Sequence, residues 1–248
     1  MTLSVLQWNV WIFEKKENLL KLIKDLSPDV VCMQELTIGS SFQDGVNVVE
    51  YLAKELGYNQ FHKAIPNLAP SEGVGDLANG IMTKLPIVST DWKWIQQPQY
   101  GGSAYDDQYR LYVEATVSAG SKKLTFGTAH VSYTDRFIDT PQRRLEADSL
   151  LEIAASKNSN YMLTGDFNSL PDSYLVSSMQ KKLIHAGPDF DVKTWTTKPF
   201  SYNGFEETKL NWRLDYAFAT KNIQVLSAEA IHTEYSDHLP ILIKLNLG

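Results

Sequence analysis

Apolar residues recur every three or four positions in four stretches of the chain, which is the spacing of helices that bury one face. In the first stretch Leu19, Leu22 and Ile23 share a face, and Pro28 marks the end of the helix. Gly57 follows the second stretch and is a suitable C-terminal cap. The four predicted helices cover residues 17–27, 46–56, 140–155 and 172–183.

The stretches between these helices have the patterns of strands. Residues 29–34 form a continuous apolar run typical of a buried strand, and residues 110–117 alternate between apolar and polar side chains. A Gly-Ser turn then leads into residues 124–130, which predicts a hairpin. Further strand candidates cover residues 3–9, 161–168, 213–220, 223–233 and 239–247. Strands with helices interposed, together with hairpins, predict an α/β fold of two mixed sheets that face each other with helices outside.

Size and composition fit one folded unit. With 248 residues and 43% hydrophobic content, residues 1–248 are expected to form a single domain with a sizeable core. No apolar run is long enough to span a bilayer, and the N-terminus lacks the pattern of a signal peptide. The lone Cys32 is expected to be a buried structural thiol. We therefore expect a cytoplasmic protein that does not act on a membrane.

The charge balance limits how a polyanion could bind. The formal net charge is −6, from 23 basic and 29 acidic residues. This disfavours a general basic surface that wraps long stretches of nucleic acid, so phosphates must be gripped locally.

Polar residues occur repeatedly where a predicted strand ends or begins. Asp166 and Asn168, two residues apart in a strand, would point the same way and could hold one ligand; a simple turn is the alternative. The others also have ordinary alternatives, such as a cap for Asn9, a core position for His130 and an ion pair with Arg213 for Asp215. The full set is Asn9, Glu35, His130, Asp166, Asn168, Asp215, Asp237 and His238.

Taken together and in this order, the segments around these residues resemble the endonuclease/exonuclease/phosphatase superfamily. The resemblance covers nearly the whole chain and rests on "QWNVW", "MQE", "NGIMTKLPI", "GTAHVS", "GDFNS", "WRLDYAF" and "SDHLPI". It implies a four-layer α/β/β/α sandwich of two mixed, mainly antiparallel sheets, with an active site at one edge of the paired sheets.

The resemblance implies a metal site beside a hydrolytic site. Glu35 would be a hard oxygen ligand of Mg²⁺, for which Mn²⁺ could substitute, with Asn9 and Asp237 as further metal-side residues. Asp166 would hold and deprotonate the attacking water, and Asn168 would donate its amide to a phosphoryl oxygen.

Three further residues complete the implied catalytic group. His238 would donate a hydrogen bond to the phosphate, and Asp215 would orient it and favour its protonated form. His130 would be a second donor, to a phosphate oxygen or to the leaving group.

Substrate contacts are expected from two family positions and from two aromatic loops. Asn79 and Arg110 fall on positions near the phosphate, although a strand-end amide and a surface arginine are equally ordinary. Tyr105 and Trp195 lie in loops rich in aromatic residues, which could stack on nucleobases or simply close the ends of the sandwich.

Two departures narrow the branch of the superfamily. Abasic-site endonucleases typically carry an acidic residue at the position of Trp11 and a tyrosine at the position of His130. Both differences make the chain more similar to tyrosyl-DNA phosphodiesterase-like or exonuclease-like members of the superfamily. We therefore expect Mg²⁺-dependent hydrolysis of phosphodiester bonds, most readily in single-stranded or end-type DNA, without an obligate protein partner. The alternatives are a phosphomonoesterase for a small phosphorylated metabolite and a catalytically silent binding module.

Overall fold

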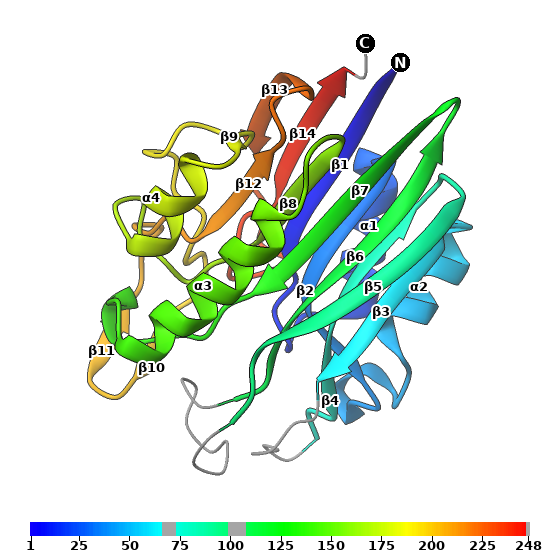
Figure 1. Ribbon diagram of the computed structural model, residues 1–248. Helices are drawn as coiled ribbons and strands as arrows, with labels where there is room; N and C mark the ends of the chain where they lie inside the picture. Colours follow the sequence, from blue (N-terminus) through cyan, green and yellow to red (C-terminus); the bar gives the residue numbers. More distant parts are fainter. Residues whose placement is uncertain (66–72, 99–107, 247–248) are drawn as a thin grey trace.

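The computed structural model describes residues 1–65, 73–98 and 108–246, and it consists of two stacked sheets of six strands each with helices on both outer faces (Figure 1). This arrangement confirms the expected four-layer sandwich. In both sheets one strand pair is parallel and the remaining pairs are antiparallel, which confirms the mixed, mainly antiparallel character.

The first sheet has the strand order β13-β14-β1-β2-β4-β3, and its parallel pair is β1 with β2. The last described strand, β14, therefore pairs with the first, and Thr2 lies opposite Asn246. The bounds are β1 Thr2–Asn9, β2 Val30–Ile38, β3 Asn59–Ile65, β4 Asp76–Thr83, β13 Gln224–Ala230 and β14 Ile241–Asn246.

The second sheet has the strand order β5-β6-β7-β8-β12-β9, and its parallel pair is β7 with β8. The predicted hairpin is present as β6 and β7. A separate two-stranded hairpin, β10 with β11, lies beyond this sheet. The bounds are β5 Ile87–Gln96, β6 Arg110–Ala119, β7 Lys122–His130, β8 Tyr161–Asp166, β9 Ile184–His185, β12 Asp215–Ala219, β10 Phe200–Tyr202 and β11 Phe205–Glu207.

All four predicted helices are present, and each covers the sheet that its neighbouring strands belong to. The last ends at Gln180 and begins two residues later than predicted, because Ser173 accepts a hydrogen bond from the backbone N–H of Val176 and so caps the start of the helix. Gly57 is the C-terminal cap of the second helix at φ 67°. The bounds are α1 Lys16–Leu26, α2 Val48–Leu56, α3 Pro141–Ala155 and α4 Tyr174–Gln180, with short 3₁₀ helices η1 Ser41–Gln43 and η3 Asp135–Phe137.

Strand alternation divides the core into three layers. In β1, Val5 packs between the two sheets, whereas Leu6 packs outward against α1 and α2. The apolar faces of α3 and α4 pack against the outer face of the second sheet. Cys32 lies in the layer between the sheets, which confirms that it is buried, and burial raises the pKa of its thiol to about 12.

Among the described residues, no helix combines the length and apolar character that crossing a membrane requires. The described helices cover sheet faces instead (Figure 1).

Candidate active site

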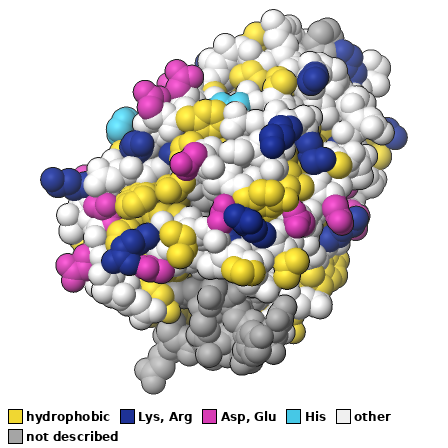
Figure 2. Space-filling view, turned by 60° about the vertical axis from the view of Figure 1, so that its left-hand side comes forward, with side chains coloured by type: hydrophobic (Ala, Val, Ile, Leu, Met, Phe, Trp, Pro, Cys, Tyr) yellow, Lys and Arg dark blue, Asp and Glu magenta, His cyan; other side chains and the backbone are white. Residues whose placement is uncertain are grey.

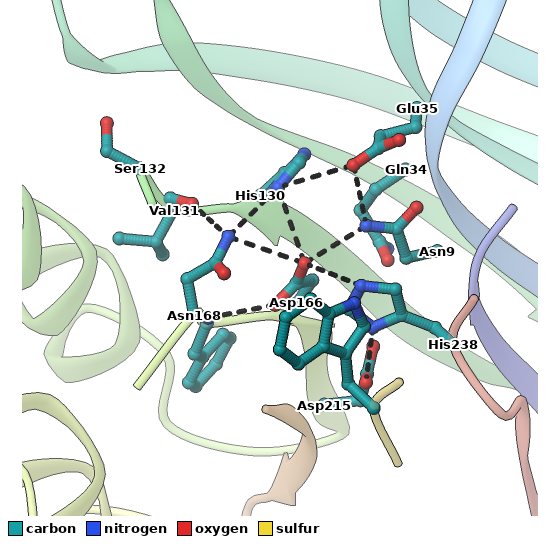
Figure 3. Close-up of polar contacts among 12 residues, drawn as sticks. Asn9, Gln34, Glu35, His130, Val131, Ser132, Asp166, Asn168, Asp215 and His238 are labelled. Atoms are coloured by element: carbon teal, nitrogen blue, oxygen red, sulfur yellow. Dashed lines mark hydrogen bonds and ion pairs between the residues drawn. The ribbon is translucent and has the colours of Figure 1, made fainter. Parts of the chain in front are cut away.

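The two sheets bring polar side chains from several strands together in one cluster (Figure 3). Asn9 ends β1, His130 ends β7 and Asp166 ends β8, whereas Asp215 begins β12. Glu35 lies in β2, and His238 comes shortly before β14. These residues are up to 229 positions apart along the chain, from residue 9 to residue 238, yet their side chains converge on Asp166.

Asp166 is the centre of the cluster. Its Oδ2 atom lies 3.0 Å from Nδ2 of Asn9, 3.4 Å from Nε2 of His130 and 3.6 Å from Nε2 of His238. The residue is only 1% exposed, so its carboxylate is positioned by protein contacts and not by bulk water.

Asn168 reaches the same site by a different route from the one expected. The strand ends at Asp166, and Asn168 lies beyond it with a left-handed backbone at φ 44°. Its backbone N–H donates to Oδ1 of Asp166 at 2.8 Å. Its amide nitrogen donates to the carbonyl of Val131 at 3.0 Å and also faces His130 and Oδ2 of Asp166, so one N–H points into the site. A turn held by Asp166, and not strand alternation, therefore places the two side chains together.

Glu35 projects from an irregular point in β2. The pairing of β2 with β4 shifts register between Met33 and Leu36, and Glu35 has φ 59°, a conformation that is costly for a side chain of this size. Asn9 donates to Oε1 of Glu35 at 2.9 Å and so links Glu35 to Asp166. The bulge thus directs Glu35 toward Asn9 instead of along the strand.

His238 is fixed from both sides. Its Nδ1 atom lies 2.8 Å from Oδ2 of Asp215, which orients the ring so that Nε2 faces Asp166. Behind it, Ser236 donates to the carbonyl of Asn9 and accepts from the backbone N–H of His238. Gln7 lies between the sheets and donates to Oδ1 of Asp215 at 3.3 Å.

The protonation behaviour of the two histidines is opposite. Burial and the nearby charges of Arg110, His238 and Arg143 hold the pKa of His130 well below its ordinary value of 6.5. Burial also opposes the charge on His238, but Asp215, Asp166 and Asp237 outweigh it and raise the pKa of His238 well above 6.5.

Burial raises the pKa of Asp166 to about 7, with Asp215 adding to the effect and His238 opposing it. A carboxylate that exchanges its proton near neutral pH has the property required of a general base.

The donor set fits a divalent cation. Glu35, Asp166 and Asp237 line the pocket, and no described lysine or arginine forms an ion pair with any of them. Burial raises the pKa of both Glu35 and Asp237, and the charge of Asp237 adds to the shift of Glu35. Carboxylate oxygens are the ligands that Mg²⁺ prefers, so a cation here would supply the missing positive charge.

A second group of possible ligands lies beside these carboxylates. Asp166, Asp215 and His238 each place one ligand atom within 4.8 Å of the others. Asp215 and His238 already contact each other through Oδ2 and Nδ1, at 2.8 Å, so these two ligand atoms are engaged within the protein.

Arg143 is a component of the site that sequence reasoning did not identify, since an arginine in the first turn of a helix is ordinarily exposed. It is instead 2% exposed, and its Nη2 atom donates to the carbonyls of Phe167 and Asn168 and to Oγ of Ser169. It therefore fixes the turn that carries Asn168. Its place in the first turn of α3 resembles an ordinary exposed cation, so the sequence gives little signal for this role.

The predicted substrate residues have different outcomes. Arg110 and Trp195 line the pocket, although Trp195 is only 3% exposed and donates from Nε1 to Oδ2 of Asp237 at 3.0 Å. Asn79 is not brought to the pocket; it is buried in β4 and donates to the carbonyl of Leu111 at 2.8 Å. Tyr105 lies outside the described residues.

The pocket above the cluster has a volume of about 360 Å³. Its base is polar, and its walls carry several aromatic side chains. These are Trp11, Phe13, Tyr133, Trp195 and Phe200. A charged phosphate could therefore bind below groups that are flat and apolar.

Comparison with known proteins agrees with this geometry. The model of the Endonuclease/Exonuclease/phosphatase family matches residues 6–238. No curated protein sequence matches the chain significantly.

Solved structures have similar folds at low sequence identity. An endonuclease/exonuclease/phosphatase from Beutenbergia cavernae DSM 12333 is 20% identical, with a TM-score of 0.77 over 100% of this chain and 72% of that one. A humanized D. rerio TDP2 is 20% identical, with a TM-score of 0.68 over 99% of both chains. A mannosyl-6-phosphatase from Bacteroides thetaiotaomicron VPI-5482 is 15% identical, with a TM-score of 0.68 over 98% of this chain and 99% of that one.

Proposed function

Because the chain belongs to the endonuclease/exonuclease/phosphatase family, whose members generally hydrolyse phosphoric esters, we propose that it is a Mg²⁺-dependent phosphodiesterase that acts on DNA. The observation that carries this proposal is the position of Asp166 between His130 and His238, next to Glu35 and Asp237, which form no ion pair with a described lysine or arginine.

In this reaction water attacks phosphorus in line with the leaving oxygen, and the P–O bond to that oxygen breaks. Asp166 accepts the proton of the attacking water, for which its raised pKa is suited. The products are a phosphomonoester and an alcohol, which takes up a proton as it leaves. The turn that Arg143 holds keeps Asn168 beside Asp166, where its amide is available to a phosphoryl oxygen.

The two histidines have separate tasks. His238, kept protonated by Asp215, donates from Nε2 to a phosphoryl oxygen as negative charge accumulates. His130, held neutral, is within reach of the same phosphate and can donate a hydrogen bond without adding charge. Glu35 and Asp237, with Asn9 beside them, would hold Mg²⁺, which would supply Lewis-acid stabilisation of the phosphoryl oxygens.

The shape of the pocket supports a diester over a monoester as the substrate. A diester carries an organic group on each side of phosphorus, and the aromatic side chains in the pocket wall can contact the second of these groups.

DNA is the proposed substrate because aromatic walls and local cations suit bases that are splayed apart. On the described part of the face in Figure 2, lysine and arginine side chains are scattered among acidic and hydrophobic ones. This distribution supports gripping single strands or frayed ends more than gripping a long duplex. The buried, free Cys32 is compatible with the cytoplasmic location that we propose.

The test is a direct comparison of bis-p-nitrophenyl phosphate with p-nitrophenyl phosphate, in Mg²⁺, in Mn²⁺ and in chelator. We expect metal-dependent turnover with a higher kcat/KM for the diester. A preference for the monoester would favour the runner-up, a phosphatase for small phosphorylated metabolites, for which the mannosyl-6-phosphatase of similar fold is the supporting observation. No turnover of either ester with any metal would indicate a binding module.

A panel of natural substrates then tests the choice of DNA. Single-stranded DNA should have a higher kcat/KM than matched duplex, RNA or sphingomyelin. A preference of tenfold or more for any of these three would reject DNA single strands as the substrate class.

A further inference from the structure

Three aromatic rings form a ladder that starts in the wall of the pocket and continues across the surface. The Trp11 and Phe13 rings have centroids 5.5 Å apart, and those of Phe13 and Phe42 are 5.7 Å apart. Trp11 and Phe13 line the pocket, whereas Phe42 lies one step beyond it. Phe13 is 48% exposed and Phe42 53% exposed, unusually high values for such large apolar side chains.

The ladder is held in place by the loops that carry it. Gln43, which is 3% exposed, donates from its side chain to the carbonyl of Glu14 and accepts from the backbone N–H of Lys16 at 3.0 Å. These bonds join the loop after β1 to the loop after β2. Lys16 and Asp44 add an ion pair of 2.5 Å between the same two loops. The rings are therefore pre-organised, which reduces the entropy lost when a ligand binds them.

A positive charge lies beside the inner end of the ladder. Nζ of Lys198 is 5.7 Å from the centre of the Trp11 ring, and it donates to the carbonyl of Glu234. A cation next to a flat ring, adjoining a pocket for phosphate, matches the alternation of phosphate and base along a nucleic acid strand. The outer end carries charged neighbours, Lys16 with Glu17 and Asp44, which interrupt the continuous apolar strip that an acyl chain would need.

We propose that the ladder formed by Trp11, Phe13 and Phe42 is a binding subsite for the nucleobases of a single strand, next to the scissile phosphate. This rests on the proposed function for its orientation, because the strand must enter the pocket beside Trp11. The first base beyond the phosphate contacts Trp11 and Phe13, and the following base contacts Phe42. Phe42 therefore matters only for substrates long enough to reach it.

The test compares Phe42→Leu with Phe42→Tyr on a dinucleotide and on a hexanucleotide, each as deoxyribose and ribose forms. Leucine keeps apolar bulk but removes the flat face, whereas tyrosine keeps the face. We expect Phe42→Leu to lower the ratio of kcat/KM for the hexanucleotide to kcat/KM for the dinucleotide by about fivefold or more. In Phe42→Tyr this ratio should stay close to that of the unaltered protein. Leu226→Ala, on β13, is the control for loss of an exposed apolar side chain, since Leu226 is 50% exposed.

A binding measurement separates this proposal from the proposed catalysis. Fluorescence anisotropy of a labelled hexanucleotide should show weaker binding to Phe42→Leu than to Phe42→Tyr, without any turnover. Binding that depends on Phe42 in a protein that hydrolyses no diester would keep the ladder and reject the catalytic proposal. Conversely, diester hydrolysis with equal hexanucleotide affinity and equal kcat/KM ratios in both variants would overturn the ladder.

A vesicle-binding experiment tests whether the three rings bind a lipid surface instead of nucleobases. Vesicles of phosphatidylcholine and sphingomyelin should bind the two variants equally. Vesicle binding that is lost in Phe42→Leu, with unchanged hexanucleotide binding, would assign the rings to a membrane surface and overturn the proposal.

Discussion

The base of the pocket and its aromatic rim differ in how deeply their side chains are buried and in which elements carry them. At the base, Asp166 is 1% exposed and His238 4% exposed, and each is held by contacts from several strands of both sheets. At the rim, Phe13 and Phe42 are about half exposed and come from two short loops. The difference indicates that the strands of the sandwich position the polar side chains at the base of the pocket, whereas the loops determine which substrates can reach them.

The largest effect is expected from Asp166→Asn, at the centre of the base. The amide keeps the size of the side chain but cannot accept the proton of water, so kcat should fall about 10²- to 10⁴-fold. Steady-state kinetics with the small diester measure this, while the melting temperature should change little. Asp91→Asn on the exposed part of β5 is the matched control. Near-normal turnover would assign the base to another group.

Glu35→Gln tests whether the base of the pocket also contains the metal site. A neutral ligand binds a hard cation more weakly, so the Mg²⁺ concentration for half-maximal rate should rise about tenfold or more. Titration of activity with Mg²⁺ gives this value, and Glu55→Gln on α2 serves as the control. An unaltered titration curve would remove Glu35 from the metal site.

Asp215→Asn tests the charge that the base of the pocket maintains on His238. The pKa of His238 is raised, so the ring stays protonated to a higher pH, and activity that needs the proton persists there. Loss of the Asp215 charge lowers that pKa, so the alkaline fall in activity should begin at least about one pH unit lower. At a fixed pH on the alkaline side, this shift corresponds to a rate about tenfold lower than that of the unaltered protein. A pH profile of kcat/KM at saturating Mg²⁺ shows the shift. An alkaline limb in the same place would mean that Asp215 acts only as a structural partner.

The smallest effect is expected from Trp195→Phe, where base and rim meet. Phenylalanine keeps a ring in the wall but loses the Nε1 donor to Asp237, which should reduce kcat/KM about two- to tenfold. Trp212→Phe is the closest control, since Nε1 of Trp212 donates to Glu207 away from the pocket. Equal effects of the two substitutions would show that the indole bond to Asp237 has no part in activity.

Most of the fold was predictable because the periodicities are strong. The alternation in β6 and β7 led directly to His130 at the end of a strand, and the helical spacing around Leu19 and Leu22 gave α1. The convergence of the polar side chains in one cluster could not be predicted from local sequence patterns. It was inferred from the order of the motifs, since pairing between distant strands leaves no periodic signal.

The parts that the sequence did not predict depend on contacts across the chain. Whether the side chain of Asn79 reaches the pocket or stays between the two sheets depends on how the sheets stack, and its amide in fact donates to the carbonyl of Leu111 on β6 of the facing sheet. Arg143 has partners 24 to 26 positions away, so its burial could not be read from the helix pattern around it. Likewise, the contact between the rings of Phe42 and Phe13 forms only because Gln43 joins the two loops that carry them.

The pairing of β1 with β14 has a consequence for the order of folding during synthesis. Because β1 lies between β2 and β14, one of its edges stays unpaired until the last strand leaves the ribosome. His238 arrives with that same strand and completes the hydrogen bond to Asp215. Such long-range pairing slows folding. It also means that the candidate active site is incomplete in a nascent chain and is assembled only after the first sheet has closed.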